Sequence, residues 1–467
     1  MRRRLTLILA LILLNVICAN TSLAHDGNTL VPDGYDAYSA GPIPDRVILM
    51  MTPTPHTSQA VNWRTNGRVD ESLAQITPAT GTPGLHLSAR LVSGTHQAIS
   101  SENGLAHYHS VTFDQLQPNT LYAYRVMGDK TWSEWFQFQT PPTDSKSFSF
   151  LYFGDAQNSV RSHFSRVIRE AFMRNQRPAF MLHAGDMVNL RDGNHDDEWG
   201  EWFDAGSFLN AMIPSVIVAG NHEFVDRMLG FNRILSPQFA PQFSTPNNGP
   251  EGLESTVYHV SYQDTLVVVL DSMSAIYEED LAIQQATWLD EVLSQSTHRW
   301  KIVSHHHPIH SVSAGRDNPV LRKHWQPIYE KYGVDLVLQG HDHTYGRGPS
   351  AASPKSEAPT LDVPIYVVSV AGPKMYVIGD DNNPNMQRMA EELQLYQTIE
   401  VSNTRIHFQA WTASGELYDA FEIIQGLDGT RTVNNLFDMD SPIHRCSNPN
   451  QPAANRCWDG KELISLP

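Results

Sequence analysis

The stretch QGHDHTYGR at residues 339–347 places two histidines, His341 and His343, two positions apart. It directly follows VDLVL at 334–338, an apolar run that is typical of a buried strand. Neutral imidazoles are common metal ligands, so a pair of them at the end of a strand is a candidate metal-binding loop. A purely polar surface turn would not require related clusters elsewhere in the chain.

Four other apolar runs end in comparable clusters: FGDAQ at 153–157, HAGDMVN at 183–189, AGNHE at 219–223 and SHHHP at 304–308. A single cluster of this kind is usually an ordinary turn. In open α/β sheets, however, the carboxyl ends of the strands form the ligand crevice, so five such endings can converge on one place. Glycine precedes several of the polar residues, which suits a sharp exit from a strand.

The clusters combine imidazole nitrogens, carboxylate oxygens and an amide oxygen, without thiolates. This donor set matches Fe, Zn or Mn. One catalytic metal commonly uses three protein ligands, and here there are at least six candidates. We therefore expect two metal ions, with a carboxylate bridging them.

Between residues 147 and 338 the pattern alternates between strands and helices, which predicts a layered α/β domain. The expected strands are 148–153, 178–183, 213–218, 256–262, 265–270, 300–304 and 334–338, and the expected helices are 159–174, 196–209, 280–296 and 319–332. From residue 364 the chain returns to strands, interrupted by an expected surface excursion at 376–394.

Residues 43–142 instead alternate apolar and polar positions between turn signals, which predicts a β-sandwich. The segment LQPNTLY at 116–122 and the later QTPP at 139–142 resemble a fibronectin type III-like module. We expect such a module to serve in packing and presentation rather than in catalysis.

The first 24 residues have a basic start, a short apolar centre and a small-residue ending, which predicts a cleaved secretory signal peptide. An uncleaved anchor is the alternative, but the apolar run is short for a membrane span. Bulky Ile17 before Cys18 argues against lipoprotein attachment. We therefore expect a secreted or periplasmic protein without stable membrane insertion after cleavage.

The chain has 467 residues, 41% of them hydrophobic, which is enough apolar material for a large core. Its formal net charge of −17 and the lack of a basic cluster argue against a nucleic-acid partner. Any anionic substrate therefore needs local positive charge. Cys446 and Cys457 remain outside the leader, and in an exported chain such a pair predicts a disulfide within a tail at 426–467.

The order Asp, Gly-Asp, Gly-Asn-His-Glu, His-x-Pro and Gly-His-x-His resembles the calcineurin-like metallophosphoesterases. Together with the sandwich, the GHDHTYGR segment makes the chain similar to the purple acid phosphatase branch in particular. The resemblance spans about residues 43–424. It implies a fibronectin type III-like β-sandwich followed by a four-layer α/β/β/α metallophosphoesterase domain at 147–425.

The resemblance also assigns the metal ligands. Asp155, Asp186 and His343 would hold the first metal, and Asp186, Asn221, His306 and His341 the second, so that Asp186 bridges. His306 occupies the first place of His-x-Pro, while His305 remains an alternative alignment.

One family position differs in this sequence. Asn189 stands where purple members have the tyrosine that binds ferric iron, so we expect a colourless protein. Gln157 could supply an oxygen ligand instead, or could hydrogen-bond to the ligands.

His222 is the candidate for stabilising the transition state or protonating the leaving group, with hydrogen bonding within its loop as the alternative. His307 and His310 are candidates for substrate contact. Arg347 could bind phosphate or simply fix its loop. The predicted activity is hydrolysis of a small phosphomonoester by metal-activated water, and the alternatives are a phosphodiesterase of the same fold and a catalytically silent binding protein. The sequence leaves the oligomeric state open.

Overall fold

The computed structural model describes residues 28–32, 34–189, 191, 195–227, 232–348, 364–380, 383–437 and 441–461. The expected leader at 1–24, including Cys18, lies outside the described residues. Within the described part of the chain, no helix combines the length and apolar character needed to cross a membrane.

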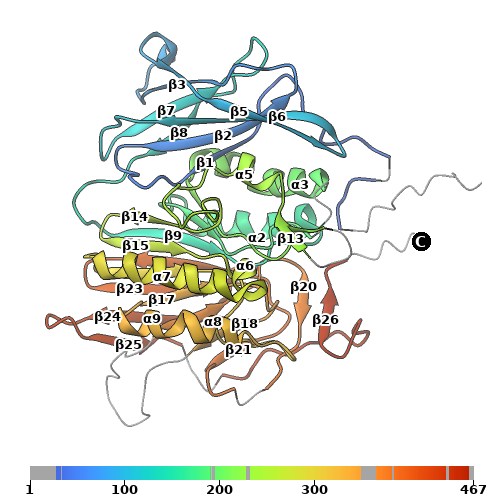
Figure 1. Cartoon of the computed structure of the whole chain (residues 1–467), viewed down its shortest axis with the longest axis vertical. Helices are drawn as coiled ribbons and strands as arrows, with labels where there is room; N and C mark the ends of the chain where they lie inside the picture. Colours follow the sequence, from blue (N-terminus) through green and yellow to red (C-terminus); the bar gives the residue numbers. More distant parts are fainter. Residues whose placement is uncertain are drawn as a thin grey trace, which may run out of the picture.

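Two β-sheets face each other in the centre of the larger domain (Figure 1). The first has eleven strands, in the order β25 (Arg431–Asn435), β24 (Leu417–Gln425), β23 (Arg405–Thr412), β22 (Leu395–Val401), β9 (Phe148–Phe153), β10 (Met181–His183), β11 (Ser215–Ile217), β1 (Asp45–Met50), β2 (Gln59–Asn66), β6 (Gly104–Phe113) and β5 (Thr95–Ser101). The second has seven strands, in the order β14 (Tyr258–Tyr262), β15 (Thr265–Val269), β16 (Trp300–Ser304), β17 (Leu336–Gln339), β19 (Ile365–Val368), β18 (Tyr345–Gly348) and β21 (Arg388–Ala390).

Alternation along the strands creates separate cores on the two faces of each sheet. On β9, Phe150 and Tyr152 point into the core between the sheets, whereas Leu151 and Phe153 point towards the helices. The helices on the first sheet are α2 (Val160–Arg174), α3 (Asp196–Gly206), α4 (Phe208–Met212) and α5 (Phe239–Gln242). Those on the second sheet are α6 (Ser272–Tyr277), α7 (Glu279–Gln295), α8 (Pro319–His324) and α9 (Gln326–Lys331). This arrangement confirms the expected α/β/β/α layers.

The segment expected to form one helix at 319–332 is divided into α8 and α9. Pro327 lies in the first turn of α9, where its missing backbone N–H costs nothing. The same proline prevents α8 from continuing unchanged into α9. Trp325, at the junction, is fully buried against the second sheet.

The N-terminal β-sandwich is confirmed, and it is continuous with the larger domain. Its first layer, β1, β2, β6 and β5, extends the eleven-stranded sheet, because Met50 of β1 pairs in parallel with Ser215 of β11. Its second layer contains β4 (Arg90–Ser93), β3 (Leu73–Pro78), β7 (Leu121–Val126) and β8 (Phe136–Gln139), with the short 3-10 helix η1 (Leu85–Leu87) nearby. Trp63, Tyr124 and Phe138 belong to the core between these layers.

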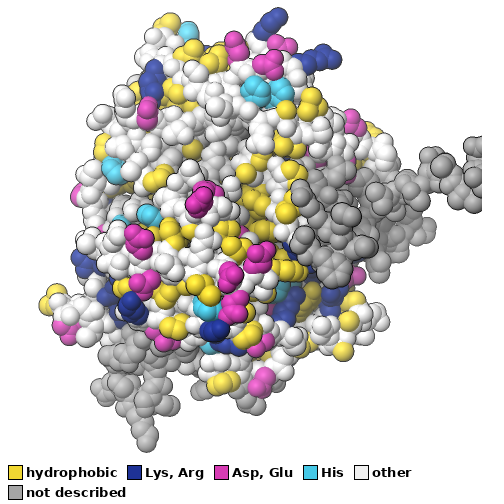
Figure 2. All heavy atoms as spheres, in the orientation of Figure 1, with side chains coloured by type: hydrophobic (Ala, Val, Ile, Leu, Met, Phe, Trp, Pro, Cys, Tyr) yellow, Lys and Arg dark blue, Asp and Glu magenta, His cyan; other side chains and the backbone are white. Residues whose placement is uncertain are grey.

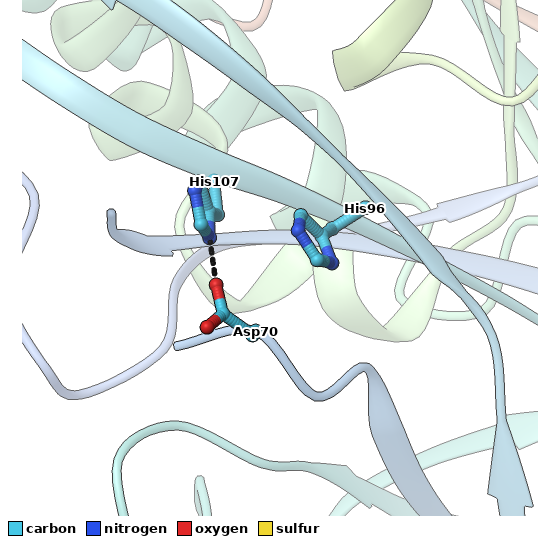
Figure 3. Close-up of side chains that lie close together, drawn as sticks. All are labelled: Asp70, His96 and His107. Atoms are coloured by element: carbon cyan, nitrogen blue, oxygen red, sulfur yellow. Dashed lines mark ion pairs between the residues drawn. The ribbon is translucent and has the colours of Figure 1, made fainter. Parts of the chain in front are cut away.

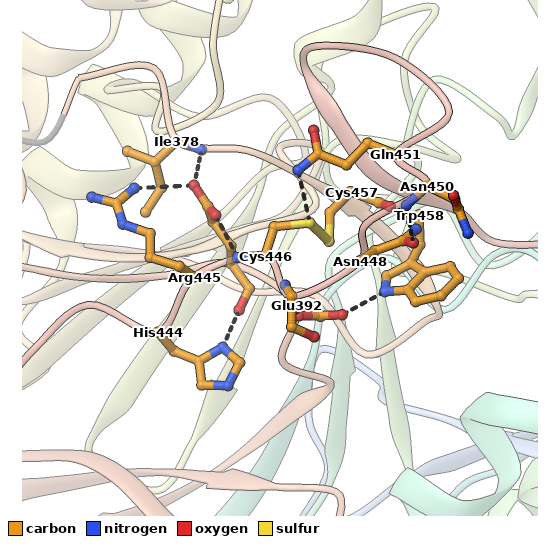
Figure 4. Close-up of a disulfide and its surroundings, with 12 residues drawn as sticks. Ile378, Glu392, His444, Arg445, Cys446, Asn448, Asn450, Gln451, Cys457 and Trp458 are labelled. Carbon is orange, nitrogen blue, oxygen red and sulfur yellow. Dashed lines mark hydrogen bonds and ion pairs between the residues drawn. A yellow bond between two sulfur atoms is a disulfide. The ribbon is translucent and has the colours of Figure 1, made fainter.

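The region beyond residue 364 is more ordered than a surface excursion and a tail. The 376–394 segment contains β21 of the second sheet, and β25 extends the first sheet past residue 425. Two further strands, β20 (Lys374–Tyr376) and β26 (Arg456–Asp459), form an antiparallel pair at one side of the molecule (Figure 1). The predicted disulfide between Cys446 and Cys457 is confirmed and closes the loop before β26 (Figure 4).

A second pair of strands, β12 (Phe224–Arg227) and β13 (Asn232–Leu235), forms a hairpin directly after the AGNHE cluster. The parallel strands β9, β10 and β11 of one sheet and β16 and β17 of the other end on the same side. Their C-terminal loops are the five clusters identified in the sequence, and the fold therefore brings these loops together.

Candidate metal centre

Unusual backbone conformations mark the loops at the ends of the central strands. Asp155, Asp186, His341 and His343 have φ values of 23°, 52°, 72° and 53°. Residues other than glycine rarely adopt this left-handed backbone conformation, and those that do concentrate at functional sites. Here the conformation belongs to the residues that carry the candidate ligands.

Two glycines are required by close packing rather than by their own φ. A Cβ on Gly220 would lie 2.3 Å from Asp186 Oδ1, and one on Gly340 would lie 2.3 Å from Asp155 Oδ2. Glycine at these positions lets neighbouring loops approach the two carboxylates directly.

The structure brings the predicted ligands into two groups that share Asp186. One group contains Asp155, Asp186 and His343, and the other contains Asp186, His306 and His341. Within each group the potential ligand atoms lie within 4.8 Å of one another. Asn221 joins the second group, because its Oδ1 lies 2.8 Å from His341 Nδ1 and 3.2 Å from His306 Nε2.

The donor set fits a cation because several lone pairs face the same space. His306 Nδ1 contacts the carbonyl oxygen of Ala184 at 2.8 Å, so in the neutral ring the proton belongs on Nδ1 and the lone pair on Nε2. That Nε2 lies 3.1 Å from Asp186 Oδ2 and 3.2 Å from Asn221 Oδ1. These acceptors repel one another unless a positive charge lies between them.

Electrostatics around His306 support this interpretation. Burial alone would lower the pKa of His306, but the carboxylates of Asp186 and Asp155 raise it to about 9. For Asp186, burial acts to raise the pKa, but His306 and His222 outweigh it and hold the value well below its usual range. The centre therefore favours added positive charge. Buried Asp155 Oδ1 has no hydrogen-bond partner among the described residues, which fits a carboxylate oxygen that can coordinate a cation.

Gln157 lies between the two ligand groups. Its amide nitrogen donates to Asp186 Oδ2 at 2.9 Å and lies 3.1 Å from His343 Nε2. With the nitrogen facing the centre, Gln157 acts as a hydrogen-bond donor to a candidate ligand. Of the two roles considered for Gln157, this orientation favours hydrogen bonding to the ligands over coordination by its oxygen.

His222 approaches the centre from the loop after β11. Its backbone N–H donates to Asp186 Oδ1 at 2.8 Å, and its Nε2 lies 3.8 Å from Asp186 Oδ2. Its Nδ1 hydrogen-bonds with the carbonyl oxygen of Asn189, and Arg191 donates to Nε2 at 3.0 Å. Burial is the main reason that the pKa of His222 falls to about 3, so the ring is neutral here.

The three consecutive histidines have different surroundings. His306 faces the centre, whereas the His305 ring packs 5.1 Å from Trp325 and 6.2 Å from Tyr329 on the helix side of the sheet. The alternative alignment with His305 as a ligand is therefore wrong. The His307 ring lies 4.1 Å from the His341 ring and thus borders the second ligand group.

His310 and Arg347, which the sequence predicts as substrate contacts, lie away from the candidate metal centre. His310 packs edge-on against Tyr366, which belongs to the core under α7 and α9. Arg347 is fully buried on β18, where Nε and Nη2 contact the two carboxylate oxygens of Asp419 at 2.7 and 3.1 Å. The substrate-binding prediction for Arg347 is therefore corrected, because its guanidinium is committed to a buried ion pair.

Glu223 was not selected as a site residue from the sequence, although it belongs to the AGNHE cluster. Its carboxylate accepts hydrogen bonds from the backbone N–H groups of Asp186, Met187 and Gly220 at 2.7–2.8 Å. It therefore fixes the loops after β10 and β11 relative to each other. The position of Glu223 directly after Asn221 and His222 is the sequence signal for this role, but the direction of its carboxylate depends on the folded loop.

A second group of metal-binding residue types lies on the sandwich and contains Asp70, His96 and His107 (Figure 3). The rings of His96 and His107 stack with centroids 4.5 Å apart and an interplanar angle of 22°. Ring nitrogens direct their lone pairs within the ring plane, so stacked rings do not aim at one ion. His107 Nδ1 also contacts the Val69 carbonyl at 2.8 Å. We assign no metal to this group.

Two facing sheets flanked by helices, with His, Asp and Asn converging at the strand ends, define a metallophosphoesterase-type centre. Comparison with known proteins agrees with this class. Residues 44–140 match the purple acid phosphatase N-terminal domain, and residues 148–345 match the calcineurin-like phosphoesterase family. The chain thus carries a purple acid phosphatase N-terminal domain followed by a calcineurin-like phosphoesterase domain.

Individual relatives are distant in sequence. An uncharacterized protein of Mycobacterium tuberculosis is 25% identical over 324 residues, which are 62% of this chain and 59% of that protein. The match thus spans less than two thirds of that relative's length. The Fe(3+)-Zn(2+) purple acid phosphatase 12 of Arabidopsis thaliana is 25% identical over 335 residues, covering 65% of this chain and 67% of that enzyme. A purple acid phosphatase from yellow lupin seeds shares the fold, with a TM-score of 0.68, 17% identity, and coverage of 83% of this chain and 75% of that one.

Proposed function

We propose that this protein is an exported phosphatase that hydrolyses small phosphomonoesters at a centre of two metal ions. The observation that carries the proposal is the pair of ligand groups that share Asp186 and direct acceptor lone pairs into one space. The match of residues 148–345 to the calcineurin-like phosphoesterase family and the purple acid phosphatases among the relatives support the same activity.

Asp155, Asp186 and His343 would hold one ion, and Asp186, Asn221, His306 and His341 the other. Imidazole, carboxylate and amide donors suit Fe, Zn or Mn. Two bound cations supply positive charge that polarises a phosphate and makes an attacking water easier to deprotonate.

The chain's own residues would orient these groups. Glu223 fixes the loop of Asp186 through three backbone hydrogen bonds, and Gln157 holds one oxygen of the same carboxylate. Such outer partners keep the ligands in a fixed geometry and are needed for full metal affinity.

His222 would act on the phosphoryl group or its leaving oxygen. Its Nδ1 proton is held by the Asn189 carbonyl, which turns Nε2 towards Asp186 and Arg191. An incoming phosphoryl oxygen beside this ring would receive charge stabilisation from Arg191, and Nε2, which carries no proton in the neutral ring, could accept one.

The test combines metal analysis with turnover. Purified protein loaded with Fe, Zn or Mn should contain about two ions per chain and hydrolyse an aryl phosphate. His306→Gln should lose at least one ion and most activity, whereas His310→Gln, the matched control, should retain both because His310 packs against Tyr366. Two ions without turnover would refute the phosphatase, and no bound ion would favour a silent binding protein. Higher kcat/KM on an aryl diester than on the monoester would establish the phosphodiesterase instead.

Export is proposed from the leader-like first 24 residues. The disulfide between Cys446 and Cys457 supports it, because such bonds persist in oxidising compartments. N-terminal sequencing of protein recovered outside the cytoplasm should begin after Ala24. Recovery of only the full-length chain in the cytoplasm would overturn this part of the proposal.

A further inference from the structure

Strand β20 lies directly beside the candidate metal centre. The backbone N–H of Tyr376 donates to the carbonyl oxygen of His343 at 3.0 Å, and the two rings are 4.8 Å apart. Side chains that surround the Tyr376 ring are therefore neighbours of a candidate metal ligand.

Three cationic side chains surround this ring. The guanidinium carbons of Arg316 and Arg456 lie 4.6 and 5.1 Å from its centroid, and Lys374 Nζ lies 5.9 Å away. Arg456 also donates to the Tyr376 hydroxyl at 3.2 Å. We call Arg316, Lys374 and Arg456 the cation cluster. Lys and Arg side chains gather beside histidine on this face of the molecule, at the level of β20 (Figure 2).

Carboxylates do not balance the cation cluster. Arg316 lies 3.5 Å from Asp342 Oδ1 and donates to the His341 carbonyl. Among the described residues, the side chain of Lys374 has no hydrogen bond or ion pair, and the buried Nε of Arg456 has no hydrogen-bond partner. Among the described residues the three half-buried cations thus have one direct carboxylate contact, from Asp342, whereas Asp155 and Asp186 act on Arg316 and Lys374 from farther away.

Such a local excess of positive charge is unexpected in a chain with a net charge of −17. Bringing like charges together in a partly desolvated place is unfavourable without a compensating anion. Burial lowers the pKa of Lys374, whereas Tyr376 and Asp186 act in the opposite direction, which places its ammonium within the field of the metal-binding carboxylate. The cluster is therefore suited to an anion that lies next to the centre.

The C-terminal tail supplies one of the three cations. β26 pairs with β20 so that Arg456 lies opposite Tyr376, and Cys457 follows Arg456 directly. The disulfide ties this strand to Cys446, whose backbone N–H donates to Glu391 Oε2 at 2.8 Å (Figure 4). The cross-link thus holds Arg456 beside Tyr376.

We propose that the cation cluster is an anion subsite that makes the enzyme selective for phosphomonoesters bearing a second anionic group, such as a carboxylate or another phosphate. This inference rests on the proposed phosphatase activity. The reacting phosphoryl group occupies the metal centre, and the second anion contacts Lys374, Arg316 and Arg456.

Substrates with a common carbon skeleton test the selectivity. With the metal-loaded protein, kcat/KM for 3-phosphoglycerate should exceed that for glycerol 3-phosphate by about tenfold, because charge-assisted hydrogen bonds contribute at this scale. Lys374→Met and Arg456→Met should each remove most of this preference while leaving glycerol 3-phosphate turnover largely intact. Lys331→Met is the matched control, since Lys331 is exposed and pairs with Asp290 on the surface.

A binding measurement separates the two proposals. 3-Phosphonopropionate should bind about tenfold more tightly than propylphosphonate in calorimetric titrations, and Lys374→Met should abolish the difference. Absence of turnover on every ester would refute the proposed function, although the binding preference could still be measured. Turnover with equal kcat/KM and equal binding of both phosphonates would refute the anion subsite alone. If Lys374→Met fails to fold, as judged by circular dichroism, the wild-type preference and Arg456→Met decide the matter.

Discussion

Replacing Arg347 by methionine should destabilise the protein without weakening substrate binding. Arg347 and Asp419 are both fully buried, and their two contacts, at 2.7 and 3.1 Å, form a bidentate ion pair. The Tyr345 hydroxyl also donates to Asp419 at 2.7 Å, and Arg347 donates to Asn435 at 3.0 Å. The pair is therefore the centre of a small buried network.

The expected magnitude follows from what each change leaves behind. Arg347→Met leaves the Asp419 carboxylate buried with the Tyr345 hydroxyl as its one side-chain donor among the described residues, and breaking a buried pair in this way costs about 3–5 kcal/mol. Removing both charges with Arg347→Met and Asp419→Leu leaves no buried ion. The double variant should therefore be more stable than the sum of the single effects predicts, by about 1–3 kcal/mol.

Equilibrium urea unfolding of the two single variants and the double variant measures this coupling. Kinetics of the metal-loaded variants on an aryl phosphate, below the unfolding transition, measure the effect on substrate. Unchanged KM with reduced stability is the expected result. A rise in KM of about tenfold with unchanged stability would show that Arg347 binds phosphate, and the role inferred from its burial would be refuted.

Three further predictions concern the centre and its supporting loops. Because Asn189 replaces the family tyrosine, the ferric-loaded wild-type protein should show no visible charge-transfer band, whereas the N189Y variant should gain one. A purple wild-type protein would contradict this prediction. Gly220→Ala should weaken metal binding by about 10–100-fold in metal titrations, because the added Cβ would lie 2.3 Å from Asp186 Oδ1. The control Gly81→Ala should bind metal normally, because no atom lies within 4 Å of its added Cβ, and equal affinities of the two variants would disprove the packing argument. Burial lowers the pKa of His183 to about 3, so below pH 6.5 the unfolded chain binds a proton that the folded chain excludes, and stability falls as the pH drops towards 3. Between pH 6 and pH 4 the unfolding free energy of His183→Leu should decline less steeply than that of the wild type, by about 1.4 kcal/mol per pH unit; parallel slopes would count against a neutral buried ring.

Local sequence determined the elements and the order of the candidate ligands. Buried strands are written as short apolar runs, and a polar cluster after each run identifies its C-terminal loop, as in GDAQ after Phe148–Phe153. Parallel strands necessarily present such loops at one edge, so the convergence of Asp155, Asp186 and the histidines could be anticipated. The even cysteine pair likewise predicted the disulfide that the structure contains.

Tertiary structure decided which polar side chains face the centre. Within QGHDHTYGR, no local signal shows that the His343 side chain lies at the centre while the Arg347 side chain is buried against Asp419. The direction of Arg347 depends on how β18 pairs with β19 and β21. The orientation of the Gln157 amide depends in the same way on its neighbours Asp186 and His343.

The cation cluster is the clearest case of information that only the fold supplies. Arg316, Lys374 and Arg456 come from a loop, from β20 and from β26, and they meet around Tyr376 only because the two strands pair beside the metal centre. Periodicity within a segment encodes which face of that segment is buried, but it does not encode which distant segment covers the face. Long-range strand pairing and the disulfide fix that choice, so the local positive charge that the acidic sequence left unexplained became visible only in three dimensions.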